Sequence, residues 1–396
     1  MKIDGTIYLD HQATTPLHSS VFEAMRPYLE GGFGNPHSTE HAFGWRASQA
    51  VERAATEVAS FIGGDPDEII FTSGATEANN LALLGIARGE IAKSRHRILL
   101  SSIEHKCVLE IGRALMTEFD LTVELIPVDG EGRVDLDALE STISDDVLLV
   151  SVMAVNNEIG TIQDIERISK VASTAGALFH CDGAQAPCAM DVSRLSDHAD
   201  LISISSHKMY GPPGIGALFA RRELQPMLRP TILGGGQQNG LRSGTVPTAL
   251  CVGFGAAAKI MGSEESKHHR TELAKLKGEF LSRLRNLPCN IWVNGSMDVR
   301  QQHPGNLNIG FENISAADLL SRLQPFLAAS SGSACTSGIP EPSHVLRAIG
   351  LDNERAASSV RFGLGKDTTT DDIREATALV EQAVDDLIDS GLLIAS

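Results

Sequence analysis

The chain has 396 residues, an apolar fraction of 42% and a formal net charge of −17, from 33 basic and 50 acidic residues. This length exceeds what one hydrophobic core usually serves, so we expect two domains. The acidic balance argues against direct nucleic-acid binding, and no apolar run approaches the ~18 residues that span a bilayer. The segment around Asp4 and Asp10 lacks a signal-peptide core, so we expect a cytoplasmic protein.

The cysteines are scattered and form no C-x-x-C pair, so we expect no structural metal site and no disulfide framework. Most of them are expected to be small buried hydrophobes. The six are Cys107, Cys181, Cys188, Cys251, Cys289 and Cys335.

The first sixty residues predict two helices after an extended entry segment, Tyr8–Pro16. The first helix covers about 17–30 and ends at Gly31-Gly32. The second ends near Phe61 and has apolar residues at helical spacing. These are Ala47, Ala50, Val51, Ala54, Val58 and Phe61.

Strands and helices then alternate, which indicates right-handed βαβ units and a doubly wound, mostly parallel sheet. Because the strands are continuously apolar, both faces of the sheet should be covered. The predicted strands cover 69–71, 98–100, 123–128, 147–155, 177–181 and 201–205, and the helices cover about 76–88, 106–118 and 164–175.

A charged helix is predicted at 263–285, and the residues that follow it predict a smaller α/β domain. Its strands lie near 289–294, 306–311 and 359–364, and its helices near 316–323 and 368–389. Thr368 and Asp371 resemble a helix-capping pair. We therefore expect an N-terminal segment 1–15 that packs with the small domain, a large cofactor domain 16–262, and a small domain 263–396.

Polar residues follow five of the predicted strands, at the sheet edge where open parallel sheets bind ligands. Any one of them has an ordinary structural explanation, but together they predict a site for a polar ligand. They are Thr72–Thr76, Glu104-His105, Asn156–Glu158, Asp182 with Gln185, and Ser205–Lys208.

The types of these residues match the needs of pyridoxal phosphate. Residues 72–76 suit a phosphate, although a simple helix N-cap is an equal alternative. Asp182 needs a cationic partner, which a protonated ring nitrogen supplies. His105 can stack on a flat ring or be a core histidine. Lys208, where a buried strand meets a rigid Gly-Pro turn, can form a Schiff base or be a solvated surface charge.

A run of small and hydroxyl residues, 331–338, predicts a mobile surface loop around Cys335. An exposed free thiol there suits a nucleophile that attacks sulfur, and a passive loop cysteine is the alternative. Downstream, Arg361 in a predicted strand can bind a substrate carboxylate with two parallel hydrogen bonds, or be a surface arginine.

These motifs, taken in order, resemble the cysteine desulfurases of the NifS/IscS type within the class V aminotransferase group, nearly from end to end. The resemblance rests on Leu9-Asp10-x-x-Ala13-Thr14-Thr15-Pro16, Gly34-Asn35-Pro36, Thr72–Glu77, Glu104-His105-Lys106, Asn156-Asn157-Glu158-x-Gly160, Ser205-x-His207-Lys208, Arg242–Thr245, Ser331–Ser337 and Arg361-Phe362. It implies the fold of type I pyridoxal phosphate enzymes.

The resemblance also implies a role for each site residue. Lys208 holds the cofactor as a Schiff base and removes the α-proton. His105 stacks on the ring and assists proton transfer, and Asp182 binds the ring nitrogen. Cys335 attacks the substrate sulfur, which gives L-alanine and a persulfide. Gln185 and Asn157 contact the ring oxygen. Asn157 and Arg361 bind the carboxylate of L-cysteine. The residues that bind the phosphate are Ala75, Thr76, Ser205, His207 and Thr245 of a second subunit.

The same resemblance implies a homodimer that passes sulfur to an acceptor protein, and Cys335 could transiently bind an iron–sulfur cluster. Iron–sulfur assembly, tRNA thiolation and DNA phosphorothioation all remain open as destinations. The alternatives are a selenocysteine lyase, an aminotransferase or a non-catalytic sulfur-transfer scaffold. Ser205-x-x-Lys208 also matches the S-x-x-K motif of serine acyl enzymes, but neither S-D-N nor K-T-G occurs.

Overall fold

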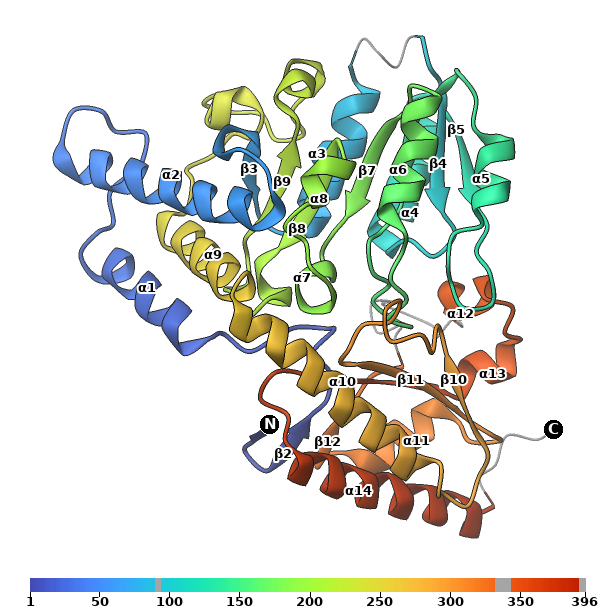
Figure 1. Cartoon of the computed structure of the whole chain (residues 1–396). Coiled ribbons are helices and arrows are strands. Elements are labelled where there is room, and N and C mark those ends of the chain that lie inside the picture. Colours follow the sequence, from blue (N-terminus) through green and yellow to red (C-terminus); the bar gives the residue numbers. More distant parts are fainter. Residues whose placement is uncertain (90–93, 332–342, 392–396) are drawn as a thin grey trace.

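The computed structural model describes residues 1–89, 94–331 and 343–391, and its largest element is a mixed seven-stranded sheet (Figure 1). Only β9 runs against its neighbours, so the sheet is mostly parallel. In spatial order the strands are β3 (Ile69–Thr72), β9 (Gly216–Ala220), β8 (Leu201–Ser205), β7 (Leu178–Asp182), β6 (Val147–Ser151), β4 (Arg97–Ser101) and β5 (Thr122–Ile126).

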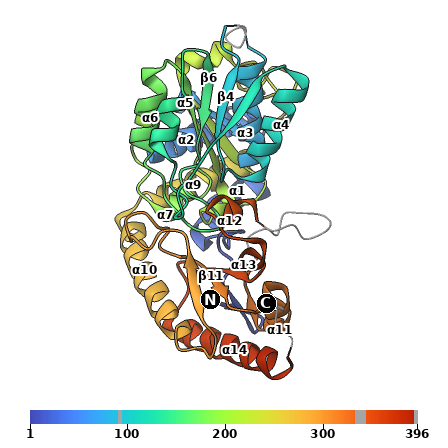
Figure 2. The ribbon, with the colours of Figure 1, turned by 90° about the vertical axis from the view of Figure 1, so that its right-hand side faces the viewer.

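Helices cover both faces of this sheet, as the apolar strands require (Figure 2). On one face, α3 (Ala75–Ala87) and α4 (Lys106–Glu118) enclose a hydrophobic core. A larger core fills the opposite face. Its helices are α1 (Ser19–Glu30), α2 (Ala42–Ile62), α5 (Leu136–Thr142), α6 (Ile165–Thr174), α7 (Ala186–Ala189), α8 (Leu195–His198) and α9 (Thr248–Met261).

A second, antiparallel sheet of β10 (Ile291–Asn294), β11 (Asn306–Phe311) and β13 (Ser359–Gly363) has its own core. The helices that pack on it are α10 (Glu264–Leu284), α11 (Ala316–Leu323) and α14 (Thr370–Asp389). Two short helices, α12 (His344–Ala348) and α13 (Asn353–Ala357), complete this part of the chain between the two sheets.

The N-terminus packs against this second core. The strand β2 (Thr6–Tyr8) pairs with β1 (Lys2–Ile3) and with β12 (Leu327–Ala328), and Ile7 is fully buried. These contacts support the division into segments 1–15, 16–262 and 263–396, which stays a prediction.

The fold class is confirmed as α/β with a mostly parallel sheet, and most predicted elements are present. The sequence analysis missed β9 and α9. It also placed the cap of α14 one residue too early. Thr369 is the N-cap and pairs with Asp372, because the hydroxyl of Thr368 already accepts a hydrogen bond from the Gly365 N–H. No helix among the described residues is long and apolar enough to cross a bilayer.

Removal of one buried aromatic ring from the second core should lower the stability of the protein strongly. Phe362 is fully buried and meets Phe280 edge to face, with ring centroids 5.2 Å apart. We expect Phe362→Ala to lower the free energy of unfolding by about 3–5 kcal/mol in chemical denaturation, because the ring leaves a cavity. Phe326→Ala is the matched control, since 55% of Phe326 is exposed. Equal losses in the two variants would contradict this account of the core.

Candidate active site

Lys208 lies where the buried strand β8 ends in a short 3₁₀ turn, Ser206–Lys208. Its Nζ donates hydrogen bonds to the carbonyl oxygens of Gln12 (2.6 Å) and Ala13 (2.7 Å). The chain then reverses at Tyr210, whose φ of 63° is in the left-handed region. The amine is therefore held at the carboxyl edge of the sheet by main-chain groups from the N-terminal segment.

Most of the predicted site residues line one cavity of about 460 Å³ at this edge. Thr245 is exposed and is not among the residues that line it, and Cys335 falls outside the described residues. The predicted residues that line the cavity are Ala75, Thr76, His105, Asn157, Asp182, Gln185, Ser205, His207, Lys208 and Arg361.

One end of the cavity carries the donors that a phosphate needs. Gly74, with φ 155°, is the N-cap of α3, and no side chain caps the first N–H groups of that helix. The His207 Nδ1 lies 3.0 Å from the Thr14 hydroxyl oxygen. Burial, together with the neighbouring Lys208 amine, lowers the pKa of His207 to about 4, so this imidazole is neutral at pH 7.

Asp182, at the end of β7, is buried and held by two hydrogen bonds. Its Oδ2 accepts from Asn79 Nδ2 at 2.8 Å, and its Oδ1 accepts from the Ala184 N–H at 3.0 Å. Nearby, Gln185 donates from Nε2 to the Gln12 carbonyl oxygen at 2.9 Å. The sequence analysis missed Asn79, and its only signal was an amide among the apolar residues on the buried side of a helix.

His105 is the N-cap of α4, and its Nδ1 accepts a hydrogen bond from the Cys107 N–H at 3.2 Å. Because Nδ1 acts as an acceptor, the proton of the neutral ring is on Nε2. Burial lowers the pKa of His105, which favours this neutral form.

Glu104 is fully buried beside these groups, and burial, followed by the charge of Asp182, raises its pKa well above the usual range. Its Oε1 accepts a hydrogen bond from the Met153 N–H at 2.6 Å. Glu104 is therefore a neutral acid, and it does not compete with Asp182 for a cationic partner.

Arg361 lies in β13 of the second sheet and lines the cavity with only 4% of its surface exposed. One terminal nitrogen donates to Asp10 Oδ1 at 2.6 Å, and the other donates to the Asn157 carbonyl oxygen at 2.8 Å. Its Nε has no partner among the described residues. A buried guanidinium with donors left over can bind a carboxylate.

The residues on either side of 332–342 are fixed by hydrogen bonds from the site. On one side, Ser330 and Arg361 exchange two backbone hydrogen bonds, of 2.6 and 3.1 Å. On the other side, Ser343 donates from its hydroxyl to Glu158 Oε2 at 2.5 Å, and His344 Nε2 lies 2.9 Å from the Glu104 carbonyl oxygen. The segment that carries Cys335 is thus tied at both ends to the site.

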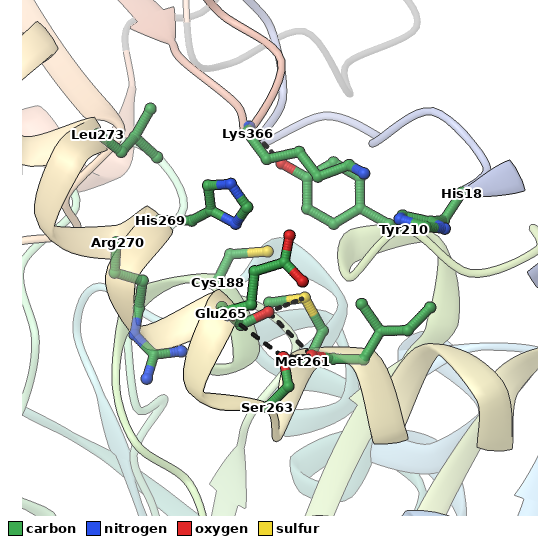
Figure 3. Close-up of a pocket in the computed structure, with 12 residues that line it drawn as sticks. His18, Cys188, Tyr210, Met261, Ser263, Glu265, His269, Arg270, Leu273 and Lys366 are labelled. Carbon is green, nitrogen blue, oxygen red and sulfur yellow. Dashed lines mark hydrogen bonds between the residues drawn. The ribbon is translucent and has the colours of Figure 1, made fainter. Parts of the chain in front are cut away.

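A smaller cavity, of about 80 Å³, lies behind Lys208 between α9, α10 and the turn at Tyr210 (Figure 3). Cys188 lines it and donates from its thiol to the Lys208 carbonyl oxygen at 3.2 Å. The Tyr210 hydroxyl points toward the backbone of Lys366 and accepts its N–H at 2.8 Å. This region therefore joins the turn after Lys208 to the loop that follows β13.

The chemistry of the main cavity fits pyridoxal phosphate. It combines uncapped helix N–H groups, a buried carboxylate that suits a pyridine nitrogen, an imidazole and a lysine amine. Ala75, Thr76, Ser205 and His207 would hold the phosphate, Asp182 the ring nitrogen, and Lys208 the aldehyde carbon.

Several known proteins resemble this chain over most of its length. The model of the aminotransferase class-V family matches residues 7–375. Cysteine desulfurase IscS of Rickettsia bellii is 46% identical over 383 residues, which cover 97% of this chain and 92% of the relative. A solved NifS-like protein matches with a TM-score of 0.89 and 33% identity, covering 96% of this chain and all of the other. A structure described as SspA in complex with cysteine matches with a TM-score of 0.79 and 34% identity, covering 91% and 99%.

Removal of the hydrogen bond between Tyr210 and Lys366 should lower the stability of the protein without loss of the cofactor. Tyr210→Phe leaves the Lys366 N–H without its acceptor, and we expect the free energy of unfolding to fall by about 1–2 kcal/mol. Tyr28→Phe is the matched control, because the Tyr28 hydroxyl accepts a long, exposed hydrogen bond from Arg53, at 3.4 Å. Chemical denaturation measures both variants, and equal stability of Tyr210→Phe and wild type would exclude this role.

Proposed function

The chain belongs to the aminotransferase class-V family and is a pyridoxal phosphate-dependent cysteine desulfurase, and we propose that Lys208, His105 and Cys335 perform its chemistry. The observation that carries this assignment is that Lys208, Asp182, His105 and Arg361 border one cavity. The reaction converts L-cysteine and the Cys335 thiol into L-alanine and a Cys335 persulfide. A selenocysteine lyase, an aminotransferase and a non-catalytic scaffold are not favoured.

Bound pyridoxal phosphate supplies an electron sink for negative charge at the α-carbon of an amino acid. The Lys208 amine, oriented by two carbonyl oxygens, takes the α-proton. Arg361, already oriented by Asp10 and by the Asn157 carbonyl, binds the substrate carboxylate. His105 carries a proton on Nε2 that can be donated within the cavity.

Cys335 is the proposed nucleophile, and its substitution separates cofactor binding from sulfur removal. We expect Cys335→Ser to keep the visible absorption of the cofactor but to lose at least about 100-fold in sulfide release with a reductant, because the hydroxyl is a poor sulfur nucleophile. Alanine and sulfide are measured together in single-turnover and steady-state assays.

Cys289→Ser is the control, because Cys289 is a half-buried thiol in the other core. It should keep wild-type rates. Sulfide release by Cys335→Ser at the rate of this control would refute the assignment of the nucleophile.

We further propose a homodimer in which Thr245 serves the cavity of the neighbouring subunit. Thr245 is exposed and is not among the residues that line the cavity of its own chain. Several large apolar side chains are exposed, which supports a partner chain. They include Phe22, Leu29, Phe33, Phe43, Trp45 and Leu233, of which Leu233 is 81% and Phe33 74% exposed.

Two substitutions test this dimer. We expect Phe33→Asp to halve the mass in sedimentation, since a charge replaces a ring that stacks on Phe43. Thr245→Val should weaken cofactor retention several-fold in dialysis, because one phosphate donor is lost. Thr56→Val, on the exposed surface of α2, should not change retention. A fully active monomeric wild type, or unchanged retention in Thr245→Val, would exclude the proposal.

We also propose that the enzyme works in the cytoplasm and passes its persulfide sulfur to an acceptor protein, with no direct nucleic-acid contact. Five described cysteines are free thiols, which fits a reducing compartment. The net charge of −17 fits a protein acceptor better than a nucleic acid. Cys335 could also bind a nascent iron–sulfur cluster as cargo. Capture of the acceptor by the persulfide form of the enzyme would identify the destination of the sulfur.

A further inference from the structure

Cys107, the second residue of α4, is a thiol that lines the main cavity beside His105 and Asp182. Its Sγ lies 3.0 Å from His105 Nδ1 and accepts a hydrogen bond from Asn79 Nδ2 at 3.2 Å. One sulfur atom thus contacts the imidazole assigned to the ring and the amide that holds Asp182.

The hydrogens of this cluster can be assigned one by one. Asn79 Nδ2 carries two hydrogens, and its two acceptors are Asp182 Oδ2 at 2.8 Å and Cys107 Sγ at 3.2 Å. Because the sulfur accepts from Asn79, its own S–H is available for His105 Nδ1. That nitrogen also accepts the Cys107 N–H, so it cannot carry a proton without losing both donors.

We propose that Asp182, Asn79, Cys107 and His105 form one hydrogen-bond chain, in which Cys107 and Asn79 are positioning residues that hold the His105 ring as its Nε2–H tautomer. This hydrogen-bond chain connects the Asp182 carboxylate, proposed for the ring nitrogen, with the His105 imidazole. It rests on the proposed roles of His105 and Asp182 in cysteine desulfuration.

Several charged groups act on His105 from the elements around it. Asp182 on β7 and Glu158 after β6 favour the imidazolium, whereas Lys208 and His344 disfavour it, and burial lowers the pKa more than any of these charges. Glu104, directly before His105, is neutral. The Cys107 thiol is neutral as well, since burial raises its pKa to about 12. It therefore acts as a hydrogen-bond donor and not as a charge.

The test is the pH profile of alanine formation by the holoenzyme in Cys107→Ala and Cys107→Ser. Removal of the S–H donor makes protonation of Nδ1 easier, so the pKa of His105 rises. We expect the acid limb of kcat/KM to move to higher pH by roughly half a unit or more in Cys107→Ala. Cys107→Ser keeps a donor and should restore the wild-type limb. Cys289→Ala, a half-buried thiol in the other core, should leave the profile unchanged.

A double-mutant cycle with Asn79→Ala tests whether the chain acts as a unit. We expect the shift of Cys107→Ala to be smaller in the Asn79→Ala background than in wild type, because Asn79 no longer orients the sulfur. Retained visible absorption shows that each variant folds and binds cofactor. Equal shifts in both backgrounds, or the same profile in Cys107→Ala and Cys107→Ser, would overturn the proposal. An inactive wild type would instead refute the proposed function.

Discussion

The site depends on a short N-terminal segment, residues 10–15, that runs between the two cores and bonds to both. Its carbonyl groups at Gln12 and Ala13 hold the Lys208 amine, and the Gln12 carbonyl also accepts from Gln185. Asp10 holds Arg361 in the second sheet. The segment therefore sets the distance between the amine on one sheet and the guanidinium on the other. Neither sheet could fix that distance alone, since each has a separate core.

Burial controls the charge of this site as much as ion pairing does. His105 and His207 are neutral because desolvation lowers their pKa values, and Glu104 is neutral because desolvation raises its pKa. Asp182 is held by an amide and a backbone N–H, and within the described residues it forms no ion pair with an arginine or lysine. Its charge therefore remains available to a ring nitrogen.

The sequence predicted the α/β class, most strands and the residues around the cavity, because strand ends and Gly-rich turns have clear local signals. It missed β9, a run of only five residues after a Gly-Pro turn, and α9, which is apolar on too many sides for an amphipathic pattern. It also missed how Lys208 is held, because backbone carbonyls have no residue signature. The roles of Asn79 and Cys107 were missed for a related reason. An amide and a thiol show their role only once the fold brings α3, α4 and β7 together.

The residues that flank 332–342 are attached to the same part of the cavity that holds Arg361. The guanidinium of Arg361 lines the cavity, and the backbone of the same residue hydrogen bonds to Ser330. At the other end Ser343 bonds to Glu158, next to Asn157, whose carbonyl orients the same guanidinium. A displacement of β13 would therefore move the Arg361 guanidinium and Ser330, which precedes this segment, together. The chain therefore leaves and re-enters the described structure at residues that are both hydrogen bonded to the groups around Arg361.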